Sequence, residues 1–151
     1  MRKFAFSLVC SVLFVALSAS AALGAAEGTD RPWKVAGSAT GIIMPGTPTT
    51  IVIEGTVQAA HLGRTRFQNV VICTLPDCST GGANTFTFVA ANGDTLTASG
   101  ENVGERTFTG GTGRFAEATG SFTFTATSVA FDPSNPLVFR LTFTETGTIS
   151  Y

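Results

Sequence analysis

The sequence predicts an all-β protein in which eight antiparallel strands form one domain. Its 151 residues include 24 Thr and 13 Phe, and only 13% are charged. Branched and aromatic side chains fit a pleated, half-buried surface, whereas a long solvated helix bundle needs more charge. In several stretches Phe and Thr alternate, for example in 85–88 and 121–125. A period of two places the Phe side chains on one face of a strand and the Thr side chains on the other.

The N-terminal segment has the pattern of a signal peptide. Residues 2 and 3 are basic, 4–17 are almost entirely apolar, and small residues follow. About 14 apolar residues are fewer than the roughly 20 that a membrane span needs, which favours cleavage over a retained anchor. We expect a cleavable signal helix within residues 1–26, cut after Ala21 or Ala26, and a single domain over 27–151. The mature protein is then secreted or periplasmic, with no stable membrane span.

The mature chain contains eight segments of strand character, separated by turns. Asn92-Gly93 favours a hairpin, because both residue types tolerate positive φ. The segment 132–136, Asp-Pro-Ser-Asn-Pro, is a second clear break. Strands with one apolar face each must close into a barrel or pack as a sandwich. The expected strands are 33–41, 50–61, 64–74, 84–91, 95–103, 105–110, 120–131 and 137–150.

The charge of the mature chain argues against a nucleic-acid partner. Loss of the signal segment leaves seven basic against ten acidic residues, with no basic run. Proteins that bind nucleic acids neutralise phosphates with clustered Lys and Arg. We therefore expect no nucleic-acid binding.

Two cysteines remain after cleavage, Cys73 and Cys78. In an exported protein, so close a pair favours a disulfide. A metal site is the alternative, but only His61 and Asp77 would be at hand to complete its ligands. A redox-active pair is a further alternative, although the Cys-x-x-Cys spacing is absent. We expect no metal site.

Three ionisable residues share the parity of the apolar face and are candidate catalytic residues. His61 continues the apolar alternation of 50–61, Arg106 shares the parity of Phe108, and Glu145 follows Phe139 to Phe143. A buried carboxyl has a raised pKa and serves as an acid or base, and an imidazole transfers protons. Each has a structural alternative: His61 hydrogen-bonds only its turn, and Glu145 lies in solvent beyond the strand.

The Phe residues of the alternating segments are the candidate lining of an internal ligand cavity. An eight-stranded barrel is either just filled by side chains or holds one small ligand, and the Phe count does not decide between them. The candidates are Phe86, Phe88, Phe108, Phe122, Phe124, Phe139 and Phe143.

A glycine-rich segment carries a family resemblance. Residues 110–120 read Gly-Gly-Thr-Gly-Arg-Phe-Ala-Glu-Ala-Thr-Gly, and a helical turn fits within 115–118. This segment resembles the Gly-Gly-Thr-Gly-x-Phe…Gly pattern of the allene oxide cyclase and dirigent superfamily, especially bacterial proteins called allene oxide cyclase barrel-like. The turn 61–64 and the closing 147–151 also look like those proteins.

The resemblance implies an eight-stranded, mostly antiparallel barrel with a site inside one mouth. Known relatives cyclise or rearrange hydrophobic unsaturated molecules, or direct radical coupling of phenols, without a cofactor. No family catalytic residue matches a position here. Three interpretations follow: an exported barrel that binds a small apolar ligand, a cofactor-free cyclase, isomerase or dirigent-like enzyme, and a packed structural or cell-surface module.

Overall fold

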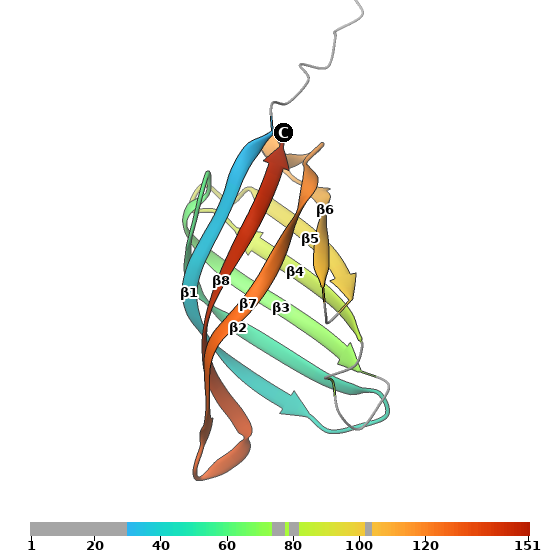
Figure 1. Cartoon of the computed structure of the whole chain (residues 1–151), viewed down its shortest axis with the longest axis vertical. Helices are drawn as coiled ribbons and strands as arrows, with labels where there is room; N and C mark the ends of the chain where they lie inside the picture. The colour runs from blue at the N-terminus through green and yellow to red at the C-terminus, as the bar shows by residue number, and fades with distance from the viewer. Residues whose placement is uncertain (1–29, 74–77, 79–81, 102–103) are drawn as a thin grey trace, which may run out of the picture.

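The chain forms a closed barrel of eight strands. The computed structural model describes residues 30–73, 78, 82–101 and 104–151, and in it each strand pairs antiparallel with the next while β1 pairs with β8 (Figure 1). This confirms the predicted all-β barrel. The signal helix expected for 1–26 lies outside the described residues. The elements are β1 Arg31–Met44, β2 Thr49–Ala59, β3 Gly63–Cys73, β4 Ala83–Val89, β5 Thr95–Glu101, β6 Glu105–Gly111, the 3-10 turn η1 Gly113–Phe115, β7 Thr119–Asp132 and β8 Asn135–Ser150.

The connections divide the barrel into two ends. The β2–β3, β4–β5 and β6–β7 connections lie at one end, which we call the closed end. The other four connections lie at the opposite end, the open end, where the long β7–β8 hairpin projects (Figure 1). Within the described part of the chain, no helix is long and apolar enough to cross a membrane.

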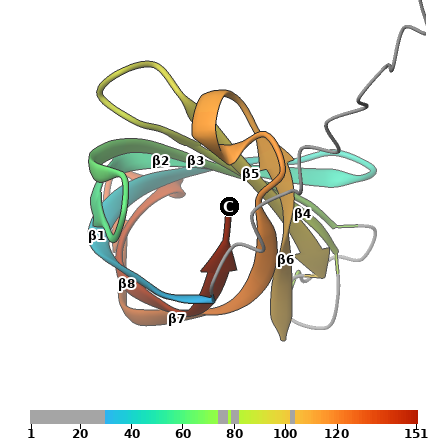
Figure 2. The ribbon, with the colours of Figure 1, turned by 90° about the horizontal axis from the view of Figure 1, so that it is seen from above.

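The turn η1 and its flanking residues lie at the rim of the closed end, beside β5 and β6 (Figure 2). Gly113 begins this turn with a φ of 57°, and a Cβ there would lie 2.2 Å from the Asp94 carboxylate. Glycine is therefore needed to bring the segment down onto the barrel. The turn buries Phe115 completely, in one hydrophobic cluster with Leu62 and Leu96. The expected single helical turn is thus present, two residues earlier than predicted.

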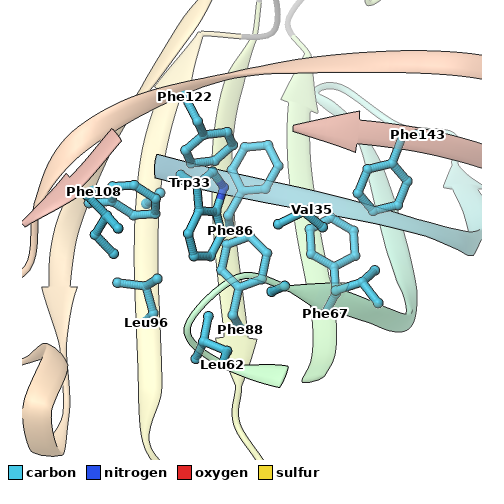
Figure 3. Close-up of a cluster of buried hydrophobic side chains, with 14 of the residues drawn as sticks. Trp33, Val35, Leu62, Phe67, Phe86, Phe88, Leu96, Phe108, Phe122 and Phe143 are labelled. Atoms are coloured by element: carbon cyan, nitrogen blue, oxygen red, sulfur yellow. The ribbon is translucent and has the colours of Figure 1, made fainter. Parts of the chain in front are cut away.

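Aromatic rings fill the interior next to the closed end (Figure 3). The Trp33 ring lies edge-on to Phe88 and Phe108, with centroids 5.3 and 5.0 Å apart. Phe86 contacts Phe122 edge-on at 5.3 Å. Edge-to-face pairs at these distances are the favoured arrangement of aromatic side chains. Because the rings touch, this half of the barrel has a packed core.

The open end differs because β7 extends beyond the end of its neighbour β6. The two strands pair only between Glu105–Thr107 and Ser121–Thr123, so the far part of β7 pairs with β8 on one side and with no described strand on the β6 side. A register shift between Ala126 and Ser128 then keeps Val129 and Phe131 opposite Leu141 and Phe139, on the inner face. Val129 is 51% exposed and Phe131 is 58% exposed. The hairpin therefore presents an apolar inner face at the barrel mouth.

Most strand boundaries differ from those expected by one to three residues, and two of these differences have a local cause. Segment 132–136 breaks the chain only at Pro133-Ser134, because Asp132 pairs directly with Asn135 and its carboxylate accepts a 2.8 Å hydrogen bond from the Ser134 amide. At the other end β2 stops at Ala59, two residues before His61. The predicted disulfide is confirmed: the sulfur atoms of Cys73 and Cys78 are 2.07 Å apart, where β3 ends at the open end.

Candidate functional site

A cavity of about 260 Å³ opens into the barrel at the open end. It is lined by inner-face residues from β2, β3, β6 and β7 and by the β5–β6 connection. Most of these side chains are apolar, and two are polar and buried. The lining includes Ile53, Asn69, Val71, Arg106, Phe124 and Ala126.

Arg106 brings a positive charge to the cavity wall. It is only 4% exposed, and its Nη1 donates a hydrogen bond to the Gly104 carbonyl. Its guanidinium carbon lies 5.9 Å from the ring centroids of both Phe86 and Phe124, within cation–π range. Burial lowers the pKa of Arg106, while the nearby Glu145 carboxyl raises it. An arginine side chain keeps its charge in such a setting.

Glu145 is buried beside this cation. It is 1% exposed and sits opposite Phe124 in the β7–β8 register. The Trp33 indole Nε1 donates a 3.0 Å hydrogen bond to its Oε2, whereas its Oε1 has no hydrogen-bond partner. Burial raises the pKa of Glu145 to about 8, against the opposing effects of the Trp33 hydrogen bond and the Arg106 charge. At neutral pH the carboxyl group is therefore mostly protonated.

Asn69 adds a third polar group, one that the sequence analysis did not single out. It is 3% exposed on β3, and its Oδ1 has no hydrogen-bond partner. A buried acceptor left without a partner costs about 1–3 kcal/mol. Its signal was present in the alternation, because Asn69 stands between the inward Phe67 and Val71.

His61 lies away from the cavity, contrary to its expected inward orientation. It occupies the β2–β3 turn at the closed end, with a φ of 69°. Its Nε2 is 3.0 Å from the Pro32 carbonyl oxygen, and its ring is 6.0 Å from that of Tyr151. The physical reason is that β2 ends at Ala59, so the two-residue period no longer governs the side chain. Of the three candidates, the structure brings together only Arg106 and Glu145.

The seven candidate Phe residues divide between core and mouth. Phe124 lines the cavity, and the Phe139 ring covers Gly41, where a Cβ would lie 2.1 Å from the ring. The other five are buried and none of them lines the cavity: four pack against one another or against Trp33, and Phe143 packs against Phe67 and Phe124. Those five are Phe86, Phe88, Phe108, Phe122 and Phe143.

The arrangement can hold a molecule that is mostly apolar and carries one polar group. The guanidinium of Arg106 and the amide of Asn69 line this hollow, and the Glu145 carboxyl interacts electrostatically with Arg106, which suits hydrogen bonding to a polar group. Among residues 30–73, 78, 82–101 and 104–151, no three His, Cys, Asp or Glu side chains gather closely enough to hold a metal ion.

Comparison with known proteins gives a likeness of fold. No protein-family model and no curated protein matches the sequence. Among solved structures, the pterocarpan synthase dirigent protein GePTS1 is similar over 82% of this chain and 84% of that chain, with 16% identity and a TM-score of 0.54. The pterocarpan synthase dirigent protein PsPTS1 is similar over 83% and 96%, with 12% identity and a TM-score of 0.56. The chain therefore has a dirigent-like eight-stranded barrel fold.

Proposed function

We propose that this chain is an exported barrel protein that binds a small, largely apolar molecule in the cavity at its open end. The observation that carries the proposal is the cavity itself, with apolar walls and the buried polar groups of Arg106 and Asn69. Ligand sites are concave and mostly apolar, with a few placed polar groups. The similar solved structures are named as synthases, and their fold is compatible with a ligand inside the barrel.

Binding of a neutral apolar fluorophore tests this function. We expect N-phenyl-1-naphthylamine to gain fluorescence with the native protein and to bind more weakly to the Ala126→Phe variant, which adds a ring to the cavity wall. Ala130→Phe is the matched control, because Ala130 is exposed on the outer face of the same strand, opposite Arg140. Equal binding to both variants would place the ligand elsewhere and contradict the proposal.

Export belongs to the same proposal. The basic and apolar N-terminal segment and the Cys73–Cys78 disulfide both support an oxidising, extracytoplasmic location. Expression of the full chain in a bacterial host should release a mature protein that begins at residue 22 or 27. Intact-mass spectrometry of the periplasmic and cytoplasmic fractions measures this, and an uncleaved cytoplasmic product would contradict it.

A cofactor-free cyclase or isomerase is the second candidate function, and Glu145 is the observation that favours it. A protonated carboxyl with one unpartnered oxygen, beside Arg106, is equipped to donate a proton to an unsaturated ligand. If the protein is an enzyme, Glu145→Gln should abolish conversion of any unsaturated compound found to react, and still bind the neutral fluorophore. Unchanged conversion by that variant would remove Glu145 from the chemistry.

A further inference from the structure

We propose that the ligand is an amphiphilic hydroxy acid that enters the barrel with its polar end first. Its carboxylate would bind the Arg106 guanidinium, a neighbouring hydroxyl would donate to Asn69, and its hydrocarbon tail would lie along the inner face of the β7–β8 hairpin. This inference rests on the proposed binding function and adds the charge, the polarity and the orientation of the ligand.

The charge of the head group follows from the balance of charges at the inner limit of the cavity. Arg106 is a cation. The carboxyl group that interacts electrostatically with it, that of Glu145, is mostly protonated near neutral pH. Among the described residues that line the cavity, Arg106 is the one ionisable residue. A carboxylate is the head group that a guanidinium binds best, because two parallel N–H donors match its two oxygens.

The hydroxyl follows from the Asn69 side chain. Its Oδ1 is buried in the cavity wall without a hydrogen-bond partner, so it needs a donor. A carboxylate offers only acceptors. A ligand hydroxyl close to the carboxylate supplies the donor and relieves the cost of the buried acceptor.

The orientation follows from what lies beyond each limit of the cavity. Inward, the contacting rings of Phe86, Phe122 and Trp33 leave no space for a tail. Outward, the hairpin exposes Val129 and Phe131 on its inner face. The cavity of about 260 Å³ is smaller than the roughly 300–1,000 Å³ of most ligand pockets, so only the head and the first carbons fit within it. The tail then covers the exposed apolar side chains.

Titration of three ten-carbon probes tests the head group. Trp33 is the only Trp of the chain and is hydrogen-bonded to Glu145, so its fluorescence reports on this region. At pH 7 and below micellar concentrations, 3-hydroxydecanoate should bind more tightly than decanoate, and decanoate more tightly than 1-decanol. Arg106→Gln should weaken binding of both acids about tenfold to a hundredfold and leave 1-decanol unchanged.

Two further variants separate binding from folding. Arg140→Gln makes the same change on the exposed outer face of β8 and should alter none of the three affinities. Asn69→Leu removes the unpartnered acceptor, so the protein should remain folded while the preference for 3-hydroxydecanoate over decanoate disappears. If Arg106→Gln fails to fold, Arg106→Lys keeps the charge without the planar fork and should still weaken both acids.

Brominated acids test the orientation, since bromine quenches a nearby indole. We expect 2-bromodecanoate to quench Trp33 fluorescence more strongly than 10-bromodecanoate. The reverse order would overturn the polar-end-first orientation. Equal affinity for decanoate and 1-decanol would overturn the anionic head group and leave the binding function intact, whereas failure of every probe, the neutral fluorophore included, would remove the binding function itself.

Discussion

The two ends of this barrel are built from the same alternating pattern and yet have different interiors. At the closed end, inward positions carry rings that contact one another, and η1 adds Phe115 over them. At the open end, the inward positions include Asn69 and Arg106, and a cavity remains. The same two-residue alternation therefore gives a packed core where the inward side chains are large and apolar. It gives a candidate binding site where polar side chains take some of the inward positions.

The comparison also separates stability from function. Buried rings without polar atoms stabilise a fold at little cost, whereas buried polar groups without partners weaken it. The closed end holds the former, and the open end holds Asn69, whose Oδ1 has no partner, while Glu145, hydrogen-bonded to Trp33 of the aromatic core, also has an unpartnered oxygen. We expect substitutions at the closed end to change mainly the free energy of unfolding, and those in the cavity wall and the hairpin of the open end to change mainly binding.

The largest effect should come from Phe115→Ala at the closed end. Removing this fully buried ring should lower the free energy of unfolding by about 3–5 kcal/mol, from lost burial and the cavity left behind. Urea denaturation followed by circular dichroism measures the change. A loss below about 1 kcal/mol would show that η1 contributes little to the barrel and would break the contrast between the two ends.

The second effect is a pH dependence from Glu145. Its pKa is about 8 in the folded protein and near 4.5 when exposed, so the folded state binds the proton more tightly. Stability from this group is therefore complete below about pH 4.5 and is lost as the pH rises to 8, by up to a few kcal/mol. Glu145→Gln should remove this decline, so that the variant is relatively more stable at pH 9 than at pH 5. Parallel curves for the two proteins across that range would contradict the raised pKa.

The third effect concerns the disulfide at the open end. Replacing both Cys73 and Cys78 by Ala should lower the free energy of unfolding by about 2 kcal/mol, because the bond closes a short loop with a sequence separation of 5. The native protein treated with a reductant is the matched control and should lose a similar amount. If neither treatment changes the urea midpoint, the bond does not stabilise this end.

The smallest effect on stability should come from the hairpin tip. Phe131→Ser replaces a ring that is 58% exposed, so the free energy of unfolding should change by less than about 0.5 kcal/mol. Binding of N-phenyl-1-naphthylamine should nevertheless weaken several-fold, because the apolar inner face of the hairpin is reduced. A large loss of stability with unchanged binding would reverse the roles assigned to the two ends.

The barrel was predictable because alternation is a local property of the sequence. The parity of Phe108 and of Phe143 correctly predicted that Arg106 and Glu145 are buried. The inward orientation predicted for His61 was wrong, because no feature of the sequence 50–61 indicates that the strand ends at Ala59. The same limit applies to the register shift after Ala126, which keeps Phe131 on the inner face.

The shape of the interior was not predictable from composition. Whether Phe residues fill a barrel or line a hollow depends on how their rings meet across strands, such as Phe67 and Phe143 at 5.0 Å. A count of ten mature Phe residues is the same in both arrangements. Asn69 was the informative residue, but its unpartnered oxygen in the cavity wall can be recognised only when its neighbours across the barrel are known.

The seam between the first and last strands has a consequence for how the protein is made. Each of the strands β1 to β7 pairs with its immediate successor, whereas closure of the barrel also requires β1 to pair with β8. Across this seam, Arg31 donates a 3.0 Å hydrogen bond to the hydroxyl of Tyr151, 120 positions along the chain. Bringing such distant segments together costs chain entropy that local hairpins do not pay, so this pairing should be late and slow. A ribosome still holding the last strand therefore carries an open sheet with two unpaired edges, at β1 and at β7.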